Sequence, residues 1–73
     1  MSNMYLIKDL ASLTGYSVYT LKYYLKIGLI KETGRSQETR FRYFDDTTVE
    51  RLKQIRDMRR LKRSIREIKD ELL

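Results

Sequence analysis

The chain has 73 residues, enough for one domain spanning residues 1–73, and a domain of this size buries only about 60% of the surface that its unfolded chain exposes. It contains no cysteine and no histidine, which excludes disulfides and Cys/His metal sites and removes the usual nucleophile–base pairs of covalent catalysis, so we expect neither an enzyme nor a cofactor. The net charge of +6, concentrated between residues 35 and 63, favours a polyanionic partner.

The first two predicted elements are short helices joined by a glycine turn. Apolar residues recur at helical spacing from Leu6 to Leu13, and the run ends at Gly15, a residue that readily takes the left-handed conformation of a helix C-terminus. Ser17 is a good N-cap residue, so a second helix is expected to begin almost at once. Two short helices about a glycine turn indicate a helix-turn-helix.

The second helix, which Gly28 ends, has two different faces. Its expected core face consists of Val18, Leu21, Tyr24 and Leu25. The opposite face carries an alternating aromatic and basic stripe at positions i, i+3, i+4 and i+7, made of Tyr19, Lys22, Tyr23 and Lys26. Core packing does not require this stripe. On an isolated helix an ordinary solvated face would be the favoured interpretation, whereas on the second helix of a helix-turn-helix DNA contact is favoured.

The hydrophobic period changes after the second helix. A polar run at residues 34–39 leads into the segment 40–44, which is rich in strand-forming aromatic residues. We expect a small two-stranded hairpin with Arg35, Arg40 and Arg42 near its tip or on its outer face. This hairpin would form a basic wing, although cations on a hairpin edge also discourage strand pairing between molecules.

A third helix is expected after an N-cap at Asp45 or Thr47. Its apolar residues advance by three each time, from Val49 to Leu61, so the apolar stripe slides around the helix and its two ends meet different neighbours. A cationic stripe on the same helix consists of Arg56, Arg59, Arg60 and Arg63. We interpret the first three mainly as a solvated face with weak local ion pairs.

A short fourth helix is predicted from the capping box Ser64-Ile65-Arg66-Glu67. Its inward residues are Ile65, Ile68 and Leu72. The fold class that follows is mainly α, a winged helix-turn-helix of four helices with a small two-stranded β-hairpin wing.

Four groups of residues carry a resemblance to a known family. They are Ile7-Lys8-Asp9-Leu10-Ala11 with Thr14-Gly15, Ser17-Val18-Tyr19-Thr20-Leu21-Lys22-Tyr23-Tyr24, Ile27-Gly28-Leu29-Ile30, and Arg42-Tyr43-Phe44 leading into Val49-Glu50-Arg51-Leu52. Together these groups resemble the DNA-binding domain of the MerR family, the mercury-resistance-type bacterial transcription regulators. The resemblance implies that the second helix enters the major groove, that the hairpin wing follows the backbone, and that the junction of the third and fourth helices forms a second wing.

The resemblance implies DNA contacts in three places. The recognition helix would contribute Ser17, Tyr19, Thr20, Lys22, Tyr23 and Lys26; the wing would contribute Arg35, Arg40 and Arg42; and the second wing would contribute Lys62 and Arg63. We expect Tyr19 near base edges and Lys22 and Tyr23 at phosphates. The hydroxyl of Ser17 is equally well explained as a helix cap.

The chain departs from the family pattern at two glycine positions. Members often show G-Y-R-x-Y in the wing, where this chain begins with Arg40, and L-G-F-S before the last helix, where it has Lys62 in second place. Lys22 also replaces the usual arginine of the R-Y-Y motif, which keeps the charge but cannot hold a phosphate in two places. The long coiled-coil helix and effector domain of the family do not follow in these residues, so we expect no small-molecule effector.

The combined prediction is a sequence-selective double-stranded DNA-binding protein that acts as a small transcription regulator. Because one small module has limited reach, a homodimer or cooperative side-by-side binding on DNA is expected. The alternatives are an excisionase-like recombination or architectural factor, a fragment of a longer regulator, and a protein-binding module that uses its tyrosines as anchors. No apolar run approaches the ~20 residues needed to cross a bilayer, so we expect no membrane partner and a cytoplasmic, nucleoid-associated location.

Overall fold

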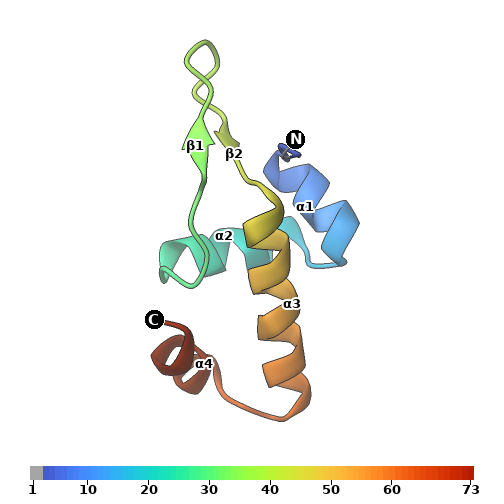
Figure 1. Cartoon of the computed structure of the whole chain (residues 1–73), viewed down its shortest axis with the longest axis vertical. Coiled ribbons are helices and arrows are strands. Elements are labelled where there is room, and N and C mark those ends of the chain that lie inside the picture. Colours follow the sequence, from blue (N-terminus) through green and yellow to red (C-terminus); the bar gives the residue numbers. More distant parts are fainter. Residues whose placement is uncertain (1–2) are drawn as a thin grey trace.

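Four helices and one β-hairpin make up residues 3–73, the part of the chain that this computed structural model describes (Figure 1). The elements in chain order are α1 Ile7–Thr14, α2 Val18–Lys26, β1 Gly34–Arg35, β2 Arg42–Tyr43, α3 Asp46–Arg60 and α4 Ile65–Leu72. The expected mainly α architecture is confirmed. The molecule measures 40 × 23 × 20 Å, with the hairpin at one end, the turn between α3 and α4 at the other, and α2 lying across the middle (Figure 1).

The turn between α1 and α2 forms as its residues predict. Gly15 has a left-handed backbone with φ 80° and donates its N–H to the Ala11 carbonyl at 2.9 Å, which closes the last turn of α1. Ser17 caps α2, because its hydroxyl oxygen accepts the Thr20 N–H at 3.0 Å. The chain therefore turns from α1 into α2 over three residues, and α1 packs against both α2 and α3.

The end of α2 turns the chain back into the core. Gly28 adopts φ 80° and donates its N–H to the Leu25 carbonyl at 3.1 Å, while the Leu29 N–H reaches the Tyr24 carbonyl at 2.9 Å. This pair of bonds is a Schellman motif, which requires the left-handed residue between them. As a result Leu29 and Ile30 are only 1% and 3% exposed.

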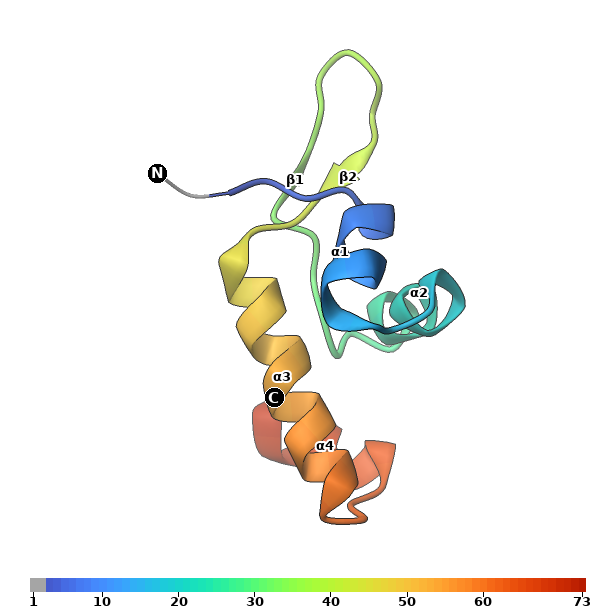
Figure 2. The same cartoon turned by 90° about the vertical axis from the view of Figure 1, so that its right-hand side faces the viewer.

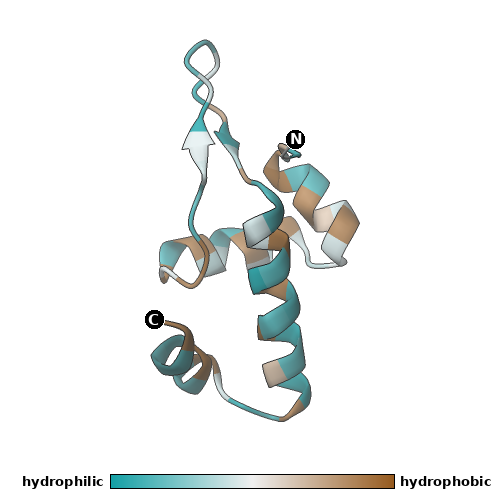
Figure 3. Cartoon of the chain, in the orientation of Figure 1, coloured by the Kyte–Doolittle hydropathy of each residue, from teal (hydrophilic) through white to brown (hydrophobic). Residues whose placement is uncertain are grey.

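The hydrophobic core draws on all four helices and on the chain at both ends of the hairpin. Its buried members are Leu10, Leu21, Tyr24, Leu29, Ile30, Phe44, Leu52, Ile55 and Ile68. Along α1 and α2 the hydrophobic segments alternate with hydrophilic ones, as amphipathic helices require (Figure 3). Two expectations were wrong: Leu13 is 56% exposed and Leu61 is 72% exposed, each at the C-terminal end of its helix, where the side chain stays largely open to solvent.

The strands of the hairpin are shorter than expected, and the loop between them lies two residues later in the chain, at residues 36–41. Gly34 pairs with Tyr43 and Arg35 with Arg42, so Gly34 and Arg35, expected in the loop, form β1. A Cβ at Gly34 would lie 2.4 Å from the Tyr43 hydroxyl oxygen, because the tyrosine ring lies over this position. Only glycine leaves room for that ring.

The root of the hairpin is held by the N-terminal segment, which runs beside it (Figure 2). Tyr5 and Phe44 exchange two backbone hydrogen bonds of 2.8 and 2.7 Å. The Tyr5 hydroxyl donates to the Asp46 carboxylate at 2.7 Å, and this bond raises the pKa of the tyrosine. The N-terminal segment therefore ties the base of the hairpin to the first turn of α3.

The caps of α3 and α4 follow the sequence. Asp45 caps α3 by accepting the Thr47 N–H at 3.0 Å. In the capping box of α4, Ser64 accepts the Glu67 N–H at 3.1 Å and donates its own N–H to the Glu67 carboxylate at 2.9 Å. Ile68 then packs α4 on α3 as a fully buried residue. Within residues 3–73 no helix is long and apolar enough to span a membrane.

Two cations, Arg40 and Lys62, have left-handed backbones, with φ of 63° and 61°. Arg40 closes the hairpin turn by donating its N–H to the Ser36 carbonyl at 2.9 Å. Lys62 follows the C-terminus of α3 and donates its N–H to the Arg59 carbonyl at 2.9 Å. These are the two positions where the family pattern has glycine, so the chain keeps the backbone conformation of glycine while carrying a positive side chain.

Candidate nucleic-acid interface

The outer face of α2 is uncovered. Tyr19 is 83% exposed and Tyr23 is 45% exposed, and the two lysines of the stripe, Lys22 and Lys26, are exposed beside them. Tyr24, by contrast, is 5% exposed, and burial raises the pKa of its hydroxyl. The adjacent tyrosines therefore lie on opposite sides of the helix, and one aromatic and basic stripe is free for a partner.

The start of α2 is occupied by its own cap. The Ser17 hydroxyl accepts the Thr20 N–H and donates to the Thr20 hydroxyl oxygen, each over 3.0 Å. Both side chains are thus engaged with each other at the N-terminus of the helix. Thr20 is half-buried, whereas Ser17 is exposed.

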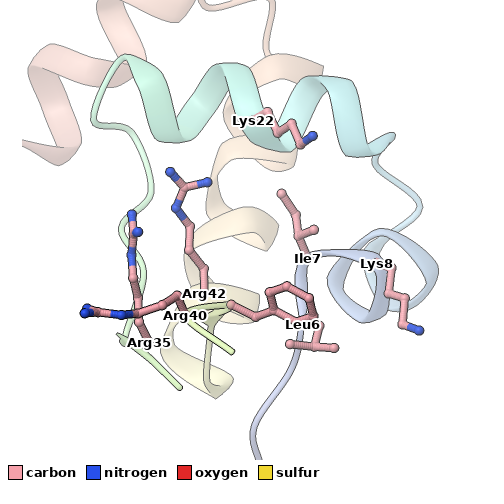
Figure 4. A pocket seen from close by; sticks show the side chains of 8 residues that line it. Leu6, Ile7, Lys8, Lys22, Arg35, Arg40 and Arg42 are labelled. Atoms are coloured by element: carbon pink, nitrogen blue, oxygen red, sulfur yellow. The ribbon is translucent and has the colours of Figure 1, made fainter. Parts of the chain in front are cut away.

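A hollow of about 500 Å³ lies between α1, α2 and the hairpin (Figure 4). Its residues are Leu6, Ile7, Lys8, Lys22, Arg35, Arg40, Phe41 and Arg42. The side chains of Leu6 and Ile7 gather on one side, while the Arg42 guanidinium reaches toward α2, where Lys22 projects (Figure 4). Cations from three elements that are distant in sequence therefore surround one apolar hollow.

A second hollow, of about 540 Å³, continues this surface toward the C-terminal end of α2. It shares Lys22, Arg35 and Arg42 with the first hollow and adds Lys26 and Lys31. The stripe of α2 and the arginines of the hairpin thus form a continuous basic surface, although they were predicted as two separate contact regions.

Two lysines of this surface, Lys8 and Lys31, were missed by sequence reasoning. Lys8 lies on the first turn of α1 and Lys31 lies just after the core pair that follows α2. Neither belongs to a basic stripe, and only the packing of α1 and the hairpin around α2 brings them beside Lys22. Their position is a tertiary property that no local pattern carried.

One carboxylate enters the basic surface. Glu32 accepts from Arg35 Nε at 3.0 Å and lies 2.9 Å from Arg42 Nε, so a single acidic side chain bridges two arginines of the wing. Among the residues of 3–73 that line the two hollows, Glu32 is the one acidic residue.

Arg56 is a structural residue, which corrects its interpretation as part of a solvated face. Its guanidinium donates to the Thr14 carbonyl at 2.5 Å and lies 4.7 Å from the centre of the Tyr16 ring. Tyr16 in turn packs edge-on against Tyr24, with ring centres 5.6 Å apart. A cation at the C-terminal carbonyl of α1 also opposes the negative end of the helix dipole. Arg56 therefore fastens α3 to the turn between α1 and α2.

The remaining cations of α3 and of the following turn have different surroundings. Arg59 and Arg60 are exposed and, with the aromatic residues beside α2, line a hollow of about 450 Å³. Arg60 also lies 3.9 Å from Asp57 in the expected weak i, i+3 pair. In the second wing, Lys62 is exposed and Arg63 forms an ion pair with Glu71.

These features define a winged helix-turn-helix domain. The sequence pattern described as "MerR HTH family regulatory protein" matches residues 5–73, and the chain belongs to this family. Among solved structures, a transcriptional regulator of the MerR family from Bacillus cereus is similar, with a TM-score of 0.86 and 29% sequence identity. The similarity covers 93% of this chain and 50% of that one, so the chain spans half the length of that regulator. Among curated proteins no sequence matches.

Proposed function

We propose that residues 1–73 act as one domain that binds double-stranded DNA with sequence selectivity and regulates transcription. The observation that carries this proposal is the uncovered aromatic and basic stripe of α2, which continues into the basic surface beside the hairpin. In helix-turn-helix proteins the second helix lies in the major groove and presents such a face to the bases. Membership of the MerR HTH family supports the same function.

In the proposed complex α2 lies in the major groove. Tyr19, the most exposed of these aromatic side chains, faces base edges, while Lys22, Tyr23 and Lys26 reach the phosphates that border the groove. Base contacts supply sequence selectivity, and phosphate contacts fix the register of the protein on the duplex.

The two wings contact the backbone on either side of this groove. The hairpin contacts phosphates through Arg35, Arg40 and Arg42. The turn between α3 and α4 contacts them through Lys62 and through Arg63, which is paired with Glu71. These sites lie at opposite ends of a molecule 40 Å long, with α2 between them (Figure 1). One turn of B-DNA is about 34–36 Å long, so both ends can reach phosphates that flank one segment of major groove.

Phosphate contacts dominate the expected affinity. A protein that neutralises about six to ten phosphates loses roughly 10³–10⁵ in affinity between 50 and 200 mM salt. A single module of this kind buries about 600–1,000 Å² of protein surface. We infer that useful occupancy requires neighbouring copies, either side by side on repeated sites or as a homodimer.

The test is the selection of bound duplexes from a random pool, repeated with Tyr19→Ala and Lys22→Ala. The tyrosine variant should select a different motif. The lysine variant should select the same motif with weaker binding, and its salt slope should fall by about 1. Lys69→Ala, which removes an equal charge from α4, is the matched control and should change neither. An unchanged motif for Tyr19→Ala would reject its role in reading bases, and absence of duplex binding at low salt would favour a protein partner.

Cooperation between copies has a separate test. Sedimentation of the protein with duplexes that carry one, two or three selected sites should show binding that is tighter per site as sites are added. Strictly independent occupancy of the three sites, without dimers in free solution, would contradict the need for neighbouring copies.

A further inference from the structure

The root of the hairpin holds a three-residue ion cluster built around Glu32. Arg35 Nε lies 3.0 Å from one carboxylate oxygen and 3.1 Å from the other, and the second oxygen also lies 2.9 Å from Arg42 Nε. The carboxylate is the least exposed member, at 33% against 47% for each arginine side chain. Both of its oxygens are therefore used, and both of its partners keep about half of their surface open to solvent.

This cluster offsets a charge repulsion that the strand register creates. Arg35 and Arg42 are direct partners across the hairpin, and like charges in that position repel each other. The only other pair between β1 and β2 is Gly34 with Tyr43, so the short ladder has little else to oppose the repulsion. A carboxylate between the two guanidinium groups offsets it.

The atoms used by the cluster decide where the arginines point. A guanidinium group is planar, so a hydrogen bond at Nε fixes its direction and leaves the two terminal nitrogens free to donate. Arg35 donates its Nε–H to both oxygens of Glu32, at 3.0 and 3.1 Å, whereas Arg42 Nε lies 2.9 Å from one of these oxygens in an ion pair. The outer end of Arg42 then extends toward α2 across the hollow (Figure 4).

We propose that Glu32 is a positioning residue for DNA binding: it directs the terminal nitrogens of Arg35 and Arg42 toward the phosphates beside α2 and so makes affinity depend on the fit of the duplex. The inference rests on the proposed function. Non-specific binding depends mainly on net charge, which Glu32 lowers, whereas specific binding depends on phosphate contacts that fix the register, which Glu32 prepares. Loss of Glu32 should therefore reduce selectivity in two ways: it strengthens binding to random DNA by raising the net charge, and it weakens binding to the selected duplex by removing oriented phosphate contacts.

The matched substitutions are Glu32→Gln and Glu38→Gln. Glutamine is uncharged and keeps one acceptor oxygen beside an amide that donates, so it cannot neutralise the two guanidinium groups. Glu38 lies in the loop of the same hairpin and forms no ion pair within residues 3–73, so its loss changes the net charge equally without touching the cluster.

The first measurement is NMR of the arginine Nε–H groups in the free protein. Wild type and Glu38→Gln should show a slowly exchanging Nε–H signal for Arg35, and this signal should exchange faster in Glu32→Gln. An unchanged exchange rate of the Arg35 Nε–H in Glu32→Gln would overturn the positioning role without any reference to DNA.

The second measurement is the ratio of affinities for a selected duplex and a random duplex. Glu32→Gln should lower this ratio about fivefold or more, with random-duplex affinity equal or higher, while Glu38→Gln keeps the ratio. Arg42→Lys, which keeps the charge but has no Nε–H, should lower the ratio as well.

The outcomes separate the two proposals. If wild type selects a duplex and Glu32→Gln selects it equally well, or if both glutamine variants change the ratio alike, the role of Glu32 is overturned and the proposed function stands. If wild type binds no duplex at low salt, the proposed function fails, and this inference fails with it.

Discussion

Replacing Lys62 with glycine should stabilise the protein. Lys62 has φ 61° and follows the C-cap of α3, where its N–H bonds the Arg59 carbonyl and the next N–H, of Arg63, bonds the Met58 carbonyl at 3.2 Å. This is a Schellman motif with lysine in the left-handed position that glycine usually occupies.

The magnitude follows from two opposing effects. A left-handed backbone costs a residue with a Cβ about 1–2 kcal/mol, and glycine avoids this cost because it has no Cβ. Glycine also loses more conformational entropy on folding, which removes roughly 0.5–1 kcal/mol of the gain. The net stabilisation is therefore about 0.5–1 kcal/mol, and since 1 kcal/mol shifts Tm by about 4–8 °C in a domain of 60–100 residues, Tm should rise by about 2–8 °C.

The assay is thermal unfolding followed by circular dichroism, with Lys62→Ala as the matched control. Alanine removes the charge but keeps the Cβ, so it should give no comparable rise in Tm. In a duplex titration both variants should lose affinity equally, because both lose the same cation. If Tm of Lys62→Gly does not exceed Tm of Lys62→Ala, the backbone at this position is not strained and the reasoning fails.

Three further predictions concern the surroundings of the basic surface. Arg56→Ala should lower the free energy of unfolding by about 2 kcal/mol in urea, since it loses a charged hydrogen bond and a cation–π contact; a change below about 0.5 kcal/mol would contradict the fastening role. Gly34→Ala should destabilise the protein by about 1–2 kcal/mol in the same assay, because the new Cβ displaces the Tyr43 ring; unchanged stability would mean that the ring moves freely. The Thr47 hydroxyl lowers the pKa of Asp45 from its ordinary 3.8, and the Ser64 N–H lowers that of Glu67 from 4.5, so both carboxylates add stability above those values that is lost as pH falls through the folded-state pKa. Tm should therefore decline below about pH 4.5, less steeply in the double variant Asp45→Asn with Glu67→Gln, and an equal slope in that variant would reject this account.

Local signals were sufficient to predict the helices. Gly15, Ser17 and Gly28 mark the ends of α1 and α2 because capping depends on residues within one turn of the helix end. The two faces of α2 followed from periodicity for the same reason, and Tyr19 and Tyr24 lie on the sides that spacing assigns to them.

Contacts between distant segments could not be predicted. Arg56 belongs to a cationic stripe by spacing, yet its partner Thr14 lies 42 residues away, and no pattern along α3 encodes that contact. Glu32 joins Arg35 and Arg42 only because the strand register places the two arginines opposite each other, and a loop expected two residues earlier in the chain does not specify that register. The cationic residues could thus be predicted from the sequence, but the contacts that orient their side chains could not.

The backbone bridge between Tyr5 and Phe44 has a consequence for the order of folding. The Tyr5 hydroxyl also reaches Asp46, 41 residues further along, so these contacts close a long loop of chain. Closing such a loop costs the chain conformational entropy before the contacts at its ends can form. The capped helices form from contacts between neighbouring residues and do not have this cost. The helices should therefore assemble early and the root of the hairpin late, and proteolytic removal of the residues up to Tyr5 should release the hairpin while α2 keeps its place on α1 and α3.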